Sequence, residues 1–217
     1  MFGIWSILKS GHWPSLAGAW LHLTVSFMVW LLIGAMSIPL MVALQLSETE
    51  IAWLVSLPLL GGAVLRMAAG WSADWLGARP TAVVILVMEC LVLCWGWLGV
   101  TGYGAALAFS TCLGVAGASF AVALPIASRA YPLPAKGFVL GIAASGNIGT
   151  VLILFWAPRW VAALDWHQVC GIMAGVVAAT LLGFVLMVPR TTPASGASAV
   201  AWWYHAVQLI HRRLAYW

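Results

Sequence analysis

Long apolar runs, separated by short polar or Gly/Pro-rich breaks, make up most of this sequence. A bilayer core about 30 Å thick needs roughly 20 apolar residues per helix, so runs of this length predict transmembrane helices. They cover approximately residues 17–45, 50–73, 81–101, 104–130, 137–163 and 167–188. Ser47, with Glu50 three residues later, predicts a capping box at the start of the second helix. The pattern therefore indicates an all-α membrane protein with six transmembrane helices.

The composition excludes an ordinary soluble domain. Of the 217 residues, 64% are hydrophobic and only 6% are charged, whereas a soluble domain carries roughly 25% charged residues. The mean hydropathy is +1.05. The 15 Trp residues agree with this, because indole rings favour the membrane–water interface. We therefore expect the lipid bilayer to surround most of this chain.

Several other functions have little support in the sequence. The nine Lys and Arg residues are scattered singly between apolar runs, apart from one adjacent pair, so we expect no nucleic-acid partner. There is no phosphate-binding loop and no evident nucleophile–base pair, so we expect neither an enzyme nor a cofactor. The cysteines lie in apolar runs without further ligands nearby, and we expect reduced thiols and no metal. They are Cys90, Cys94, Cys112 and Cys170.

Positive charge is distributed unevenly between the two ends of the predicted helices. One side carries Lys9, Arg79, Arg129, Lys136, Arg190, Arg212 and Arg213. The other side carries Arg159 together with Glu48, Glu50 and Asp165. Because Lys and Arg are enriched in cytoplasmic loops, we predict a multi-pass protein of the inner (cytoplasmic) membrane with both termini in the cytoplasm.

Composition divides the chain into four parts. Residues 1–16 are predicted to form a cytoplasmic segment, and residues 17–190 the transmembrane domain. The small residues of TTPASGASA indicate a linker at residues 191–200. Residues 201–217 place apolar side chains on one helical face and basic ones elsewhere, which predicts an amphipathic helix at the membrane surface. This tail could instead lead into a seventh helix.

One charge lies inside an apolar run. In LPLLGGAVLRMAAGWSADWLGARP (residues 57–80), Arg66 has no acidic residue close to it in the sequence. On a helix, Gly62, Arg66, Gly70 and Asp74 form one stripe, because they are spaced by four. The glycines would let a neighbouring helix approach closely. Arg66 itself would lie about 12 Å from the cytoplasmic end of its helix, too deep to reach the headgroups easily.

The break between the second and third predicted helices resembles the G-x-x-x-D-x-x-G-x-R signature of the major facilitator superfamily. Gly70, Asp74, Gly77 and Arg79 match it, on the side predicted to be cytoplasmic. The resemblance implies that Asp74 and Arg79, with a nearby helix end, latch the cytoplasmic side in the outward-facing state. Gly77 would make the tight turn. The superfamily has two six-helix halves, and this chain would supply the N-terminal half.

Three segments resemble the nitrate/nitrite porters of that superfamily in particular. LPLLGGAVLRMAAG is similar to their second helix, and GVAGASFAVALPIASRAYP (residues 114–132) is similar to their fourth. KGFVLGIAASGNIGTVLILFWAPRW (residues 136–160) is similar to their fifth helix, which carries a Gly-rich signature around an Asn. The matching residues are Gly141, Gly146, Asn147 and Gly149.

The resemblance implies an anion site built from these segments. Arg66 would bind the anion, because a guanidinium fork can hold planar nitrate through two in-plane hydrogen bonds. Phe120 would cover the face of the anion, and Asn147 would donate an amide hydrogen bond. Gly146 and Gly149 would let the helices pack closely enough to bring their backbones near the substrate.

A half-size unit would leave one flank uncovered. An Arg at this depth that faces lipid costs at least about 2.5 kcal/mol, so we expect a partner. It could be a second copy in a parallel homodimer or a separately encoded second half, and the function would be transport of a small oxyanion, nitrate or nitrite. Alternatively, the chain is a non-transporting accessory or scaffold subunit of a larger membrane complex. It could also be a fragment of a longer transporter.

Each of these residues also has a structural interpretation. Arg66 could reach the headgroups or a helix-end carbonyl, and Asn147 could link two helices by a hydrogen bond. His22 would be a packing residue with satisfied hydrogen bonds. The predicted helices lack a carboxylate relay for proton coupling, with Glu89 as the one exception, and we expect Glu89 to be neutral or to face a polar crevice.

Overall fold

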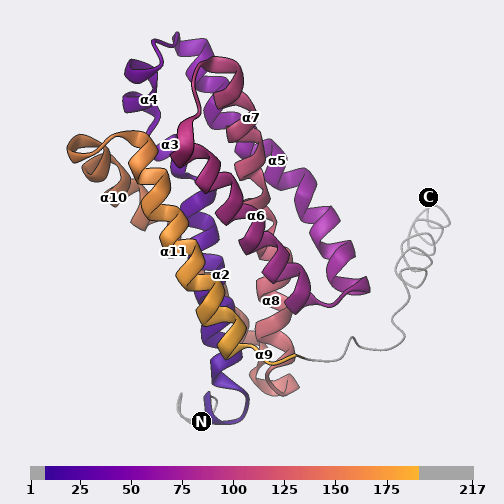
Figure 1. Cartoon of the computed structure of the whole chain (residues 1–217). Coiled ribbons are helices and arrows are strands. Elements are labelled where there is room, and N and C mark those ends of the chain that lie inside the picture. Colours follow the sequence, from indigo (N-terminus) through magenta and orange to yellow (C-terminus); the bar gives the residue numbers. More distant parts are fainter. Residues whose placement is uncertain (1–7, 191–217) are drawn as a thin grey trace, which may run out of the picture.

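The computed structural model describes residues 8–190, and all regular structure in that range is helical. The predicted linker (residues 191–200) and tail (residues 201–217) lie outside the described residues, as does the beginning of the N-terminal segment. Figure 1 shows one bundle of long helices, with the start of α2 (Trp13–Trp30) and the end of α11 (Trp166–Met187) at the same end. The all-α prediction is confirmed for the described residues.

Five helical segments are long and apolar enough to cross a membrane. The first two are α5 (Glu48–Trp75) and α6 (Ala78–Gly99). The next combines α7 (Tyr103–Leu113), η1 (Gly114–Ser119) and α8 (Phe120–Arg129), and we call it the fourth segment. The fifth segment combines η2 (Leu133–Ala135), α9 (Lys136–Ala144), η3 (Ser145–Asn147) and α10 (Ile148–Ala163), and α11 follows it. These segments agree closely with the last five predicted helices, and the predicted Ser47–Glu50 capping box is present.

The first predicted helix, residues 17–45, is not a single helix. It begins earlier, at Trp13, and is divided into α2, α3 (Leu32–Ala35) and α4 (Ser37–Ala43). The second division has a cause in the sequence: Pro39 has no N–H for the carbonyl of Ala35, so a new helix starts with the proline in its first turn. The first predicted helix therefore corresponds to three consecutive helices, α2, α3 and α4.

The helices are arranged in two layers. α5, the fourth segment, α2 and α10 lie next to one another in that order. α6 and α11 pack against each other and cover the fourth segment and α2 from one side (Figure 1). The core lies between these layers, while α5 leaves most of its surface exposed. An exposed apolar helix of this length needs either lipid or a protein partner against it.

Two close helix crossings depend on glycine. Where α5 crosses η1, a Cβ atom on Gly117 would lie 2.8 Å from the Cα atom of Gly62. Where α10 crosses α2, a Cβ atom on Gly149 would overlap the carbonyl oxygen of Thr24. Glycine lets the backbones touch at both crossings. The first crossing brings the carbonyl groups of η1 within reach of side chains on α5.

Pro58 interrupts the hydrogen bonding of α5, and side chains from two other helices compensate for this. Pro58 has no N–H for the carbonyl of Leu54, which is left without its helical donor. The hydroxyl of Ser110 on α7 donates to that carbonyl instead. In addition, the indole Nε1 of Trp30 donates to the carbonyl of Pro58 at 2.7 Å. Because an unpaired backbone group is costly in a membrane, these bonds fix α5 against α7 and α2.

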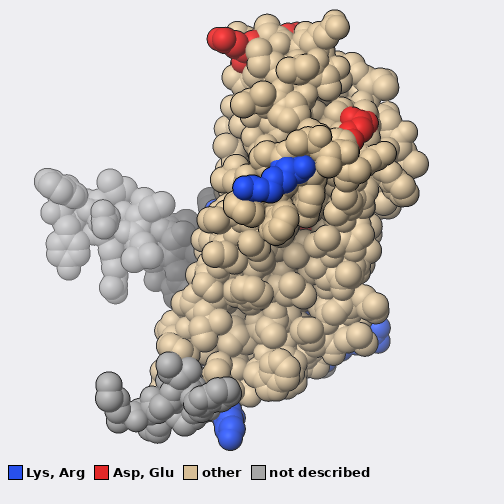
Figure 2. Space-filling view, turned by 90° about the vertical axis from the view of Figure 1, so that its left-hand side faces the viewer, with Lys and Arg blue, Asp and Glu red and all other residues tan. Residues whose placement is uncertain are grey.

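Charged side chains lie mainly at the ends of the bundle. On the face shown in Figure 2, a wide uncharged belt separates the Asp and Glu side chains near one end from Lys and Arg side chains near the other, with one further cation nearer the acidic end. An uncharged belt between charged ends is the arrangement expected of a protein that crosses a bilayer. The assignment of these ends to the two sides of the membrane stays a prediction.

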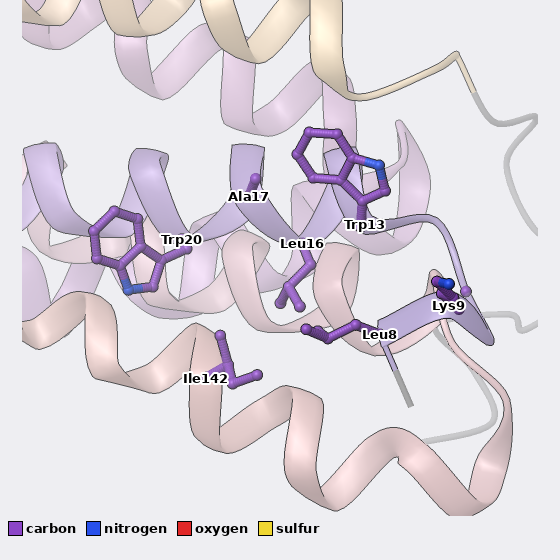
Figure 3. A pocket seen from close by; sticks show the side chains of 8 residues that line it. Leu8, Lys9, Trp13, Leu16, Ala17, Trp20 and Ile142 are labelled. Carbon is purple, nitrogen blue, oxygen red and sulfur yellow. The ribbon is translucent and has the colours of Figure 1, made fainter. Parts of the chain in front are cut away.

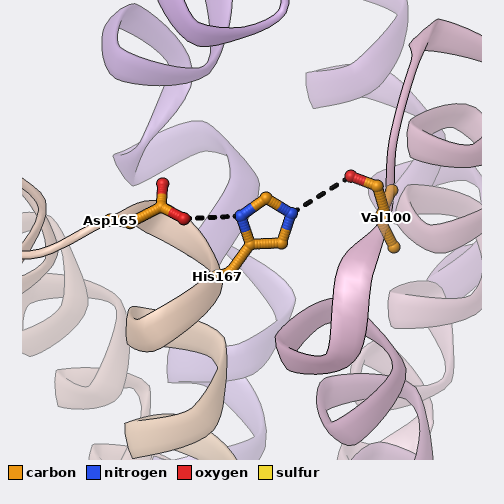
Figure 4. Close-up of polar contacts among 3 residues, drawn as sticks. All are labelled: Val100, Asp165 and His167. Atoms are coloured by element: carbon orange, nitrogen blue, oxygen red, sulfur yellow. Dashed lines mark hydrogen bonds and ion pairs between the residues drawn. The ribbon is translucent and has the colours of Figure 1, made fainter.

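A polar bridge joins α11 to the loop after α6 at the acidic end (Figure 4). Nδ1 of His167 lies 2.7 Å from a carboxylate oxygen of Asp165, and Nε2 lies 3.1 Å from the carbonyl oxygen of Val100. Both partners accept hydrogen bonds, so the ring makes both bonds fully only when both of its nitrogens carry protons. The ring of His167 therefore links Asp165, at the start of α11, to the loop after α6.

Candidate functional site

Arg66 is held at the crossing of α5 and η1. Its Nε and Nη2 atoms donate to the carbonyl oxygen of Gly117, at 3.3 and 3.1 Å. The close approach of Gly62 and Gly117 makes these bonds possible. The guanidinium is half-buried and directed at a neighbouring segment. Gly117 lies inside the fourth segment, so Arg66 neither reaches for the headgroups nor caps the end of a membrane-spanning helix.

Aromatic rings from two helices surround the guanidinium. Its Cζ atom lies 5.4 Å from the ring centre of Phe120 and 5.8 Å from that of Trp30. The ring of Phe27 lies between them, 5.2 Å from Trp30 and 6.4 Å from Phe120. Such rings stabilise a cation near their faces and exclude water from one side. The structure thus brings together Arg66 and Phe120, two of the predicted site residues.

The charge of Arg66 has no anionic partner in the described part of the chain, where the one ion pair joins His167 to Asp165. A guanidinium carries five N–H groups, and the Gly117 carbonyl takes only two of them. The remaining N–H groups are available to an acceptor. A half-buried, uncompensated guanidinium with free donors is suited to binding a small anion.

Asn147 is not brought to Arg66. It lies on η3, which packs against α2, whereas Arg66 lies on α5 at the opposite edge of that layer. Its side chain is exposed and makes no hydrogen bond within residues 8–190, so it does not link two helices there. Gly146 and Gly149 pack directly against the backbone and side chains of α2, in agreement with close helix packing. Gly141 has no atom near enough to explain a glycine.

The four signature residues between α5 and α6 are arranged around a turn. Gly77 has a φ of +97°, a conformation that favours glycine. Nε and Nη2 of Arg79 donate to the carbonyl oxygens of Val188 and Val185, at 2.6 and 3.2 Å. These carbonyls belong to the end of α11, where a cation is favoured. Asp74 is exposed and has no ion-pair partner among the described residues, and Gly70 faces no neighbouring atom there.

A cavity of about 670 Å³ opens beside the start of α2 (Figure 3). Trp13 and Trp20 of α2 line it together with Ile142 of α9, and among the described residues that line it, Lys9 is the one that carries a charge. Trp20 precedes Trp30 by ten residues, which is about 15 Å along a helix. The cavity is therefore separate from the Arg66 site, and its lining offers little chemistry beyond apolar contact.

The sequence analysis missed three residues of the site. Gly117 supplies the acceptor for Arg66, Trp30 supplies one of the two rings beside its guanidinium, and Phe27 packs against both of those rings. They come from helices distant in the sequence, and aromatic residues are common throughout this chain. The one indication of a close crossing in the sequence was the presence of glycines at 61–62 in one predicted helix and at 114 and 117 in another.

Long apolar helices, and a half-buried guanidinium held where two of them cross, define a multi-pass helical membrane protein with a cationic site at the flank of the bundle. The chain belongs to the Major Facilitator Superfamily, whose family model matches residues 19–210.

Curated relatives agree with the resemblance to nitrate/nitrite porters. The chain is 33% identical over 171 residues to a probable nitrate/nitrite transporter, NarK2, of Mycobacterium tuberculosis, a match that covers 78% of this chain and 43% of that protein. It is 30% identical over 148 residues to the nitrite extrusion protein of Bacillus subtilis, covering 68% and 37%. It is 28% identical over 201 residues to a probable nitrate/nitrite antiporter, NarK2, of Thermus thermophilus, covering 89% and 42%. The chain spans less than half the length of these relatives.

Proposed function

We propose that this chain is the N-terminal half of a transporter for nitrate or nitrite, and that a second half completes the anion path. The observation that carries the proposal is Arg66: a guanidinium fixed by Gly117, placed beside Phe120 and Trp30, without a carboxylate partner in the described chain. The names of the relatives supply the choice of anion.

The proposed site is suited to a planar, singly charged oxyanion. The free N–H groups of Arg66 would hold two oxygens of nitrate in the plane of the guanidinium. Phe120, whose ring centre lies 5.4 Å from Cζ of Arg66, would lie against the face of the anion. The Gly117 carbonyl orients the guanidinium before the anion arrives, which reduces the cost of ordering it on binding. Asn147 would act on the anion only at another stage of transport or in another arrangement of the helices.

The exposed surface of α5 supports the need for a second half. Val64 and Met67, on either side of Arg66 in the sequence, are 62% and 72% exposed, and the guanidinium is only half-buried. If lipid covered this surface, Arg66 would be exposed to it at a cost of at least about 2.5 kcal/mol. A second copy in a parallel homodimer, a separately encoded half, or a second half of a longer chain of which this is a fragment would cover it. In each case we place the protein in the inner membrane with both termini cytoplasmic, and reporter fusions at each terminus test this orientation.

Reconstitution of the full chain into proteoliposomes tests the proposed function. We expect uptake of isotopically labelled nitrate or nitrite by the assembled form, and a mass in mild detergent that corresponds to two halves. The main alternative is a scaffold subunit derived from a transporter. A large assembly that co-purifies with the chain, together with no uptake of either anion, would contradict the transporter proposal and favour the scaffold.

The Asp74–Arg79 region gives a separate prediction about the proposed latch. Replacing Arg79 by Ala removes the bonds to the end of α11 and should lower the free energy of unfolding by about 1–3 kcal/mol. Replacing Asp74 by Asn should leave stability unchanged, because Asp74 is exposed and makes no ion pair in the described chain. If Asp74 latches a second half, uptake should nevertheless fall roughly 5-fold or more. Normal uptake by the Asp74 variant would exclude a latch role.

A further inference from the structure

Three polar side chains are sealed inside the bundle, away from Arg66. His22 and Ser26 lie on α2, Glu89 lies on α6, and all three have an exposed fraction of 0%. Nδ1 of His22, Oγ of Ser26 and both carboxyl oxygens of Glu89 have no hydrogen-bond partner in the described chain. Buried polar atoms almost always have partners. Four unpaired atoms facing one helix interface therefore require an explanation.

The other ring nitrogen of His22 determines its tautomer. Nε2 lies 3.2 Å from the carbonyl oxygen of Ala82 on α6. A carbonyl can only accept, so Nε2 carries the hydrogen and donates it. In the neutral imidazole, Nδ1 is then a bare lone pair. The interior of the bundle thus contains a base that has no donor.

Glu89 supplies the missing donor when its carboxyl group is protonated. Residues four apart on a helix lie on the same face, about 5–6 Å apart at Cβ, so His22 and Ser26 are neighbours on α2. Ser26 lies against the carboxyl group of Glu89, although not at hydrogen-bonding geometry. The order along the interface is therefore base, hydroxyl, acid.

Glu89 makes no ion pair with any cation of residues 8–190. On α5, Arg66 is directed at Gly117, and Arg79, at the start of α6, is directed at the end of α11. An isolated carboxylate buried in an apolar environment is strongly disfavoured. The other titratable groups on α6 and α11 are the thiols of Cys90, Cys94 and Cys170 and the ring of His167, which is bonded to Asp165 and Val100. On the other elements packed against α6, Tyr103 and Cys112 lie on α7, and Arg129 lies at the end of α8. Cys90 donates to the carbonyl of Ala174 on α11, at 3.8 Å, and not to Glu89.

We propose that Glu89, Ser26 and His22 form a proton-binding site inside the bundle, in which the carboxyl proton of Glu89 is shared with Nδ1 of His22 through the hydroxyl of Ser26. In the transfer, the O–H bond of Glu89 breaks, Ser26 accepts that proton, and its own hydroxyl proton passes to Nδ1. A carboxylate and an imidazolium then replace the acid and the neutral ring, with no change in net charge. The transfer requires side-chain rotations that bring the three groups to hydrogen-bonding distance, since none of these atoms is bonded in the described chain. The site goes beyond the proposed function, since it requires no anion.

Infrared spectroscopy of the full chain in lipid nanodiscs tests the proposal directly. At neutral pH we expect a C=O band from a protonated carboxyl group, which Glu89→Gln removes. The matched control Glu48→Gln, at the exposed start of α5, should leave this band unchanged. Ser26→Ala and His22→Gln should each shift its frequency, whereas Ser56→Ala on α5, whose hydroxyl bonds to its own helix, should not.

Three outcomes would overturn the site. If Glu89→Gln leaves the infrared C=O band of protonated carboxyl groups unchanged, Glu89 is ionised. Its oxygens then accept hydrogen bonds from another source, for example water. If the band is present but neither Ser26→Ala nor His22→Gln shifts it, Glu89 is only a buried acid. If the wild-type band does not shift in D₂O, its proton does not exchange. The last measurement uses no variant, so the test stands even if a substitution disturbs folding.

Discussion

If the proposed function is correct, replacing Arg66 by Lys should weaken nitrate or nitrite binding, and uptake by the proposed transporter, roughly 10- to 100-fold. Lys keeps the positive charge but loses the planar fork. One ammonium group cannot both hold the Gly117 carbonyl, as Nε and Nη2 now do, and bind two oxygens of an anion in one plane. A hydrogen bond to a charged group contributes about 1.5–3 kcal/mol, and each 1.4 kcal/mol corresponds to tenfold in affinity.

Arg159→Lys on α10 is the matched control for this variant. Arg159 lies over the ring of Phe155, with Cζ 3.6 Å from its centre, and donates to the carbonyl of Phe155 in its own helix. It is on the side of the membrane predicted to be non-cytoplasmic and has no role in the proposed site, so its variant should bind and transport normally. Anion titration of the purified assembly and proteoliposome uptake measure the two effects. Equal activity of both variants and the wild type would show that Arg66 does not bind the anion directly.

Replacing Gly149 by Ala is expected to lower the free energy of unfolding by about 1–3 kcal/mol, the usual cost of forcing extra volume into a tightly packed position. The added methyl group would overlap the carbonyl oxygen of Thr24. That oxygen belongs to the backbone of α2, so no side-chain rotation can relieve the overlap. α10 must instead move away from α2, and contacts along the whole crossing weaken.

Gly141→Ala, in the same segment, provides the control. A Cβ atom there meets no atom within 4 Å, and Ala is favoured over Gly inside a helix by roughly 0.5–1 kcal/mol. This variant should therefore be as stable as the wild type or slightly more so. Thermal unfolding in a mild detergent measures both. If Gly149→Ala matches Gly141→Ala in stability, then α10 and α2 do not approach each other as closely as the structure indicates.

The two glycine variants also distinguish a role in helix packing from a role in anion binding. The resemblance to nitrate/nitrite porters does not separate these two roles. Gly146 and Gly149 were expected to lie at the anion site, but both pack against α2. If the reduced stability of the Gly149 variant explains its whole loss of uptake, Gly149 has a packing role. A loss of anion binding in a fully stable Gly149 variant would instead support the role implied by the resemblance.

The sequence alone determined the class of fold, because each relevant interaction is local. Apolar runs of bilayer length predict helices independently of how the helices pack, and α5, α6 and α11 begin and end close to the predicted residues. The capping box at Ser47 and the turn at Gly77 involve residues within one turn of each other. The signature motifs were likewise readable, since a motif match requires only order and spacing.

Tertiary structure decided what surrounds the important side chains. Hydrophobic periodicity cannot state which helix lies beside which, because most faces of a membrane helix are apolar whether they meet lipid or protein. Thus Gly117 and Trp30 became the neighbours of Arg66, while Asn147 was placed on the far side of α2.

The same reason explains one wrong prediction and one unexpected cluster. The first predicted helix, residues 17–45, is divided at Leu31 and Met36, and the second division follows from Pro39 rather than from helix packing. His22 was predicted to be a satisfied packing residue, but it keeps an unpaired nitrogen. Only the packing of α2 on α6 placed that nitrogen and Glu89 along one interface, since the two residues are 67 positions apart in the chain. The sequence thus determined the helices and their charges, and helix packing determined which charges and donors meet.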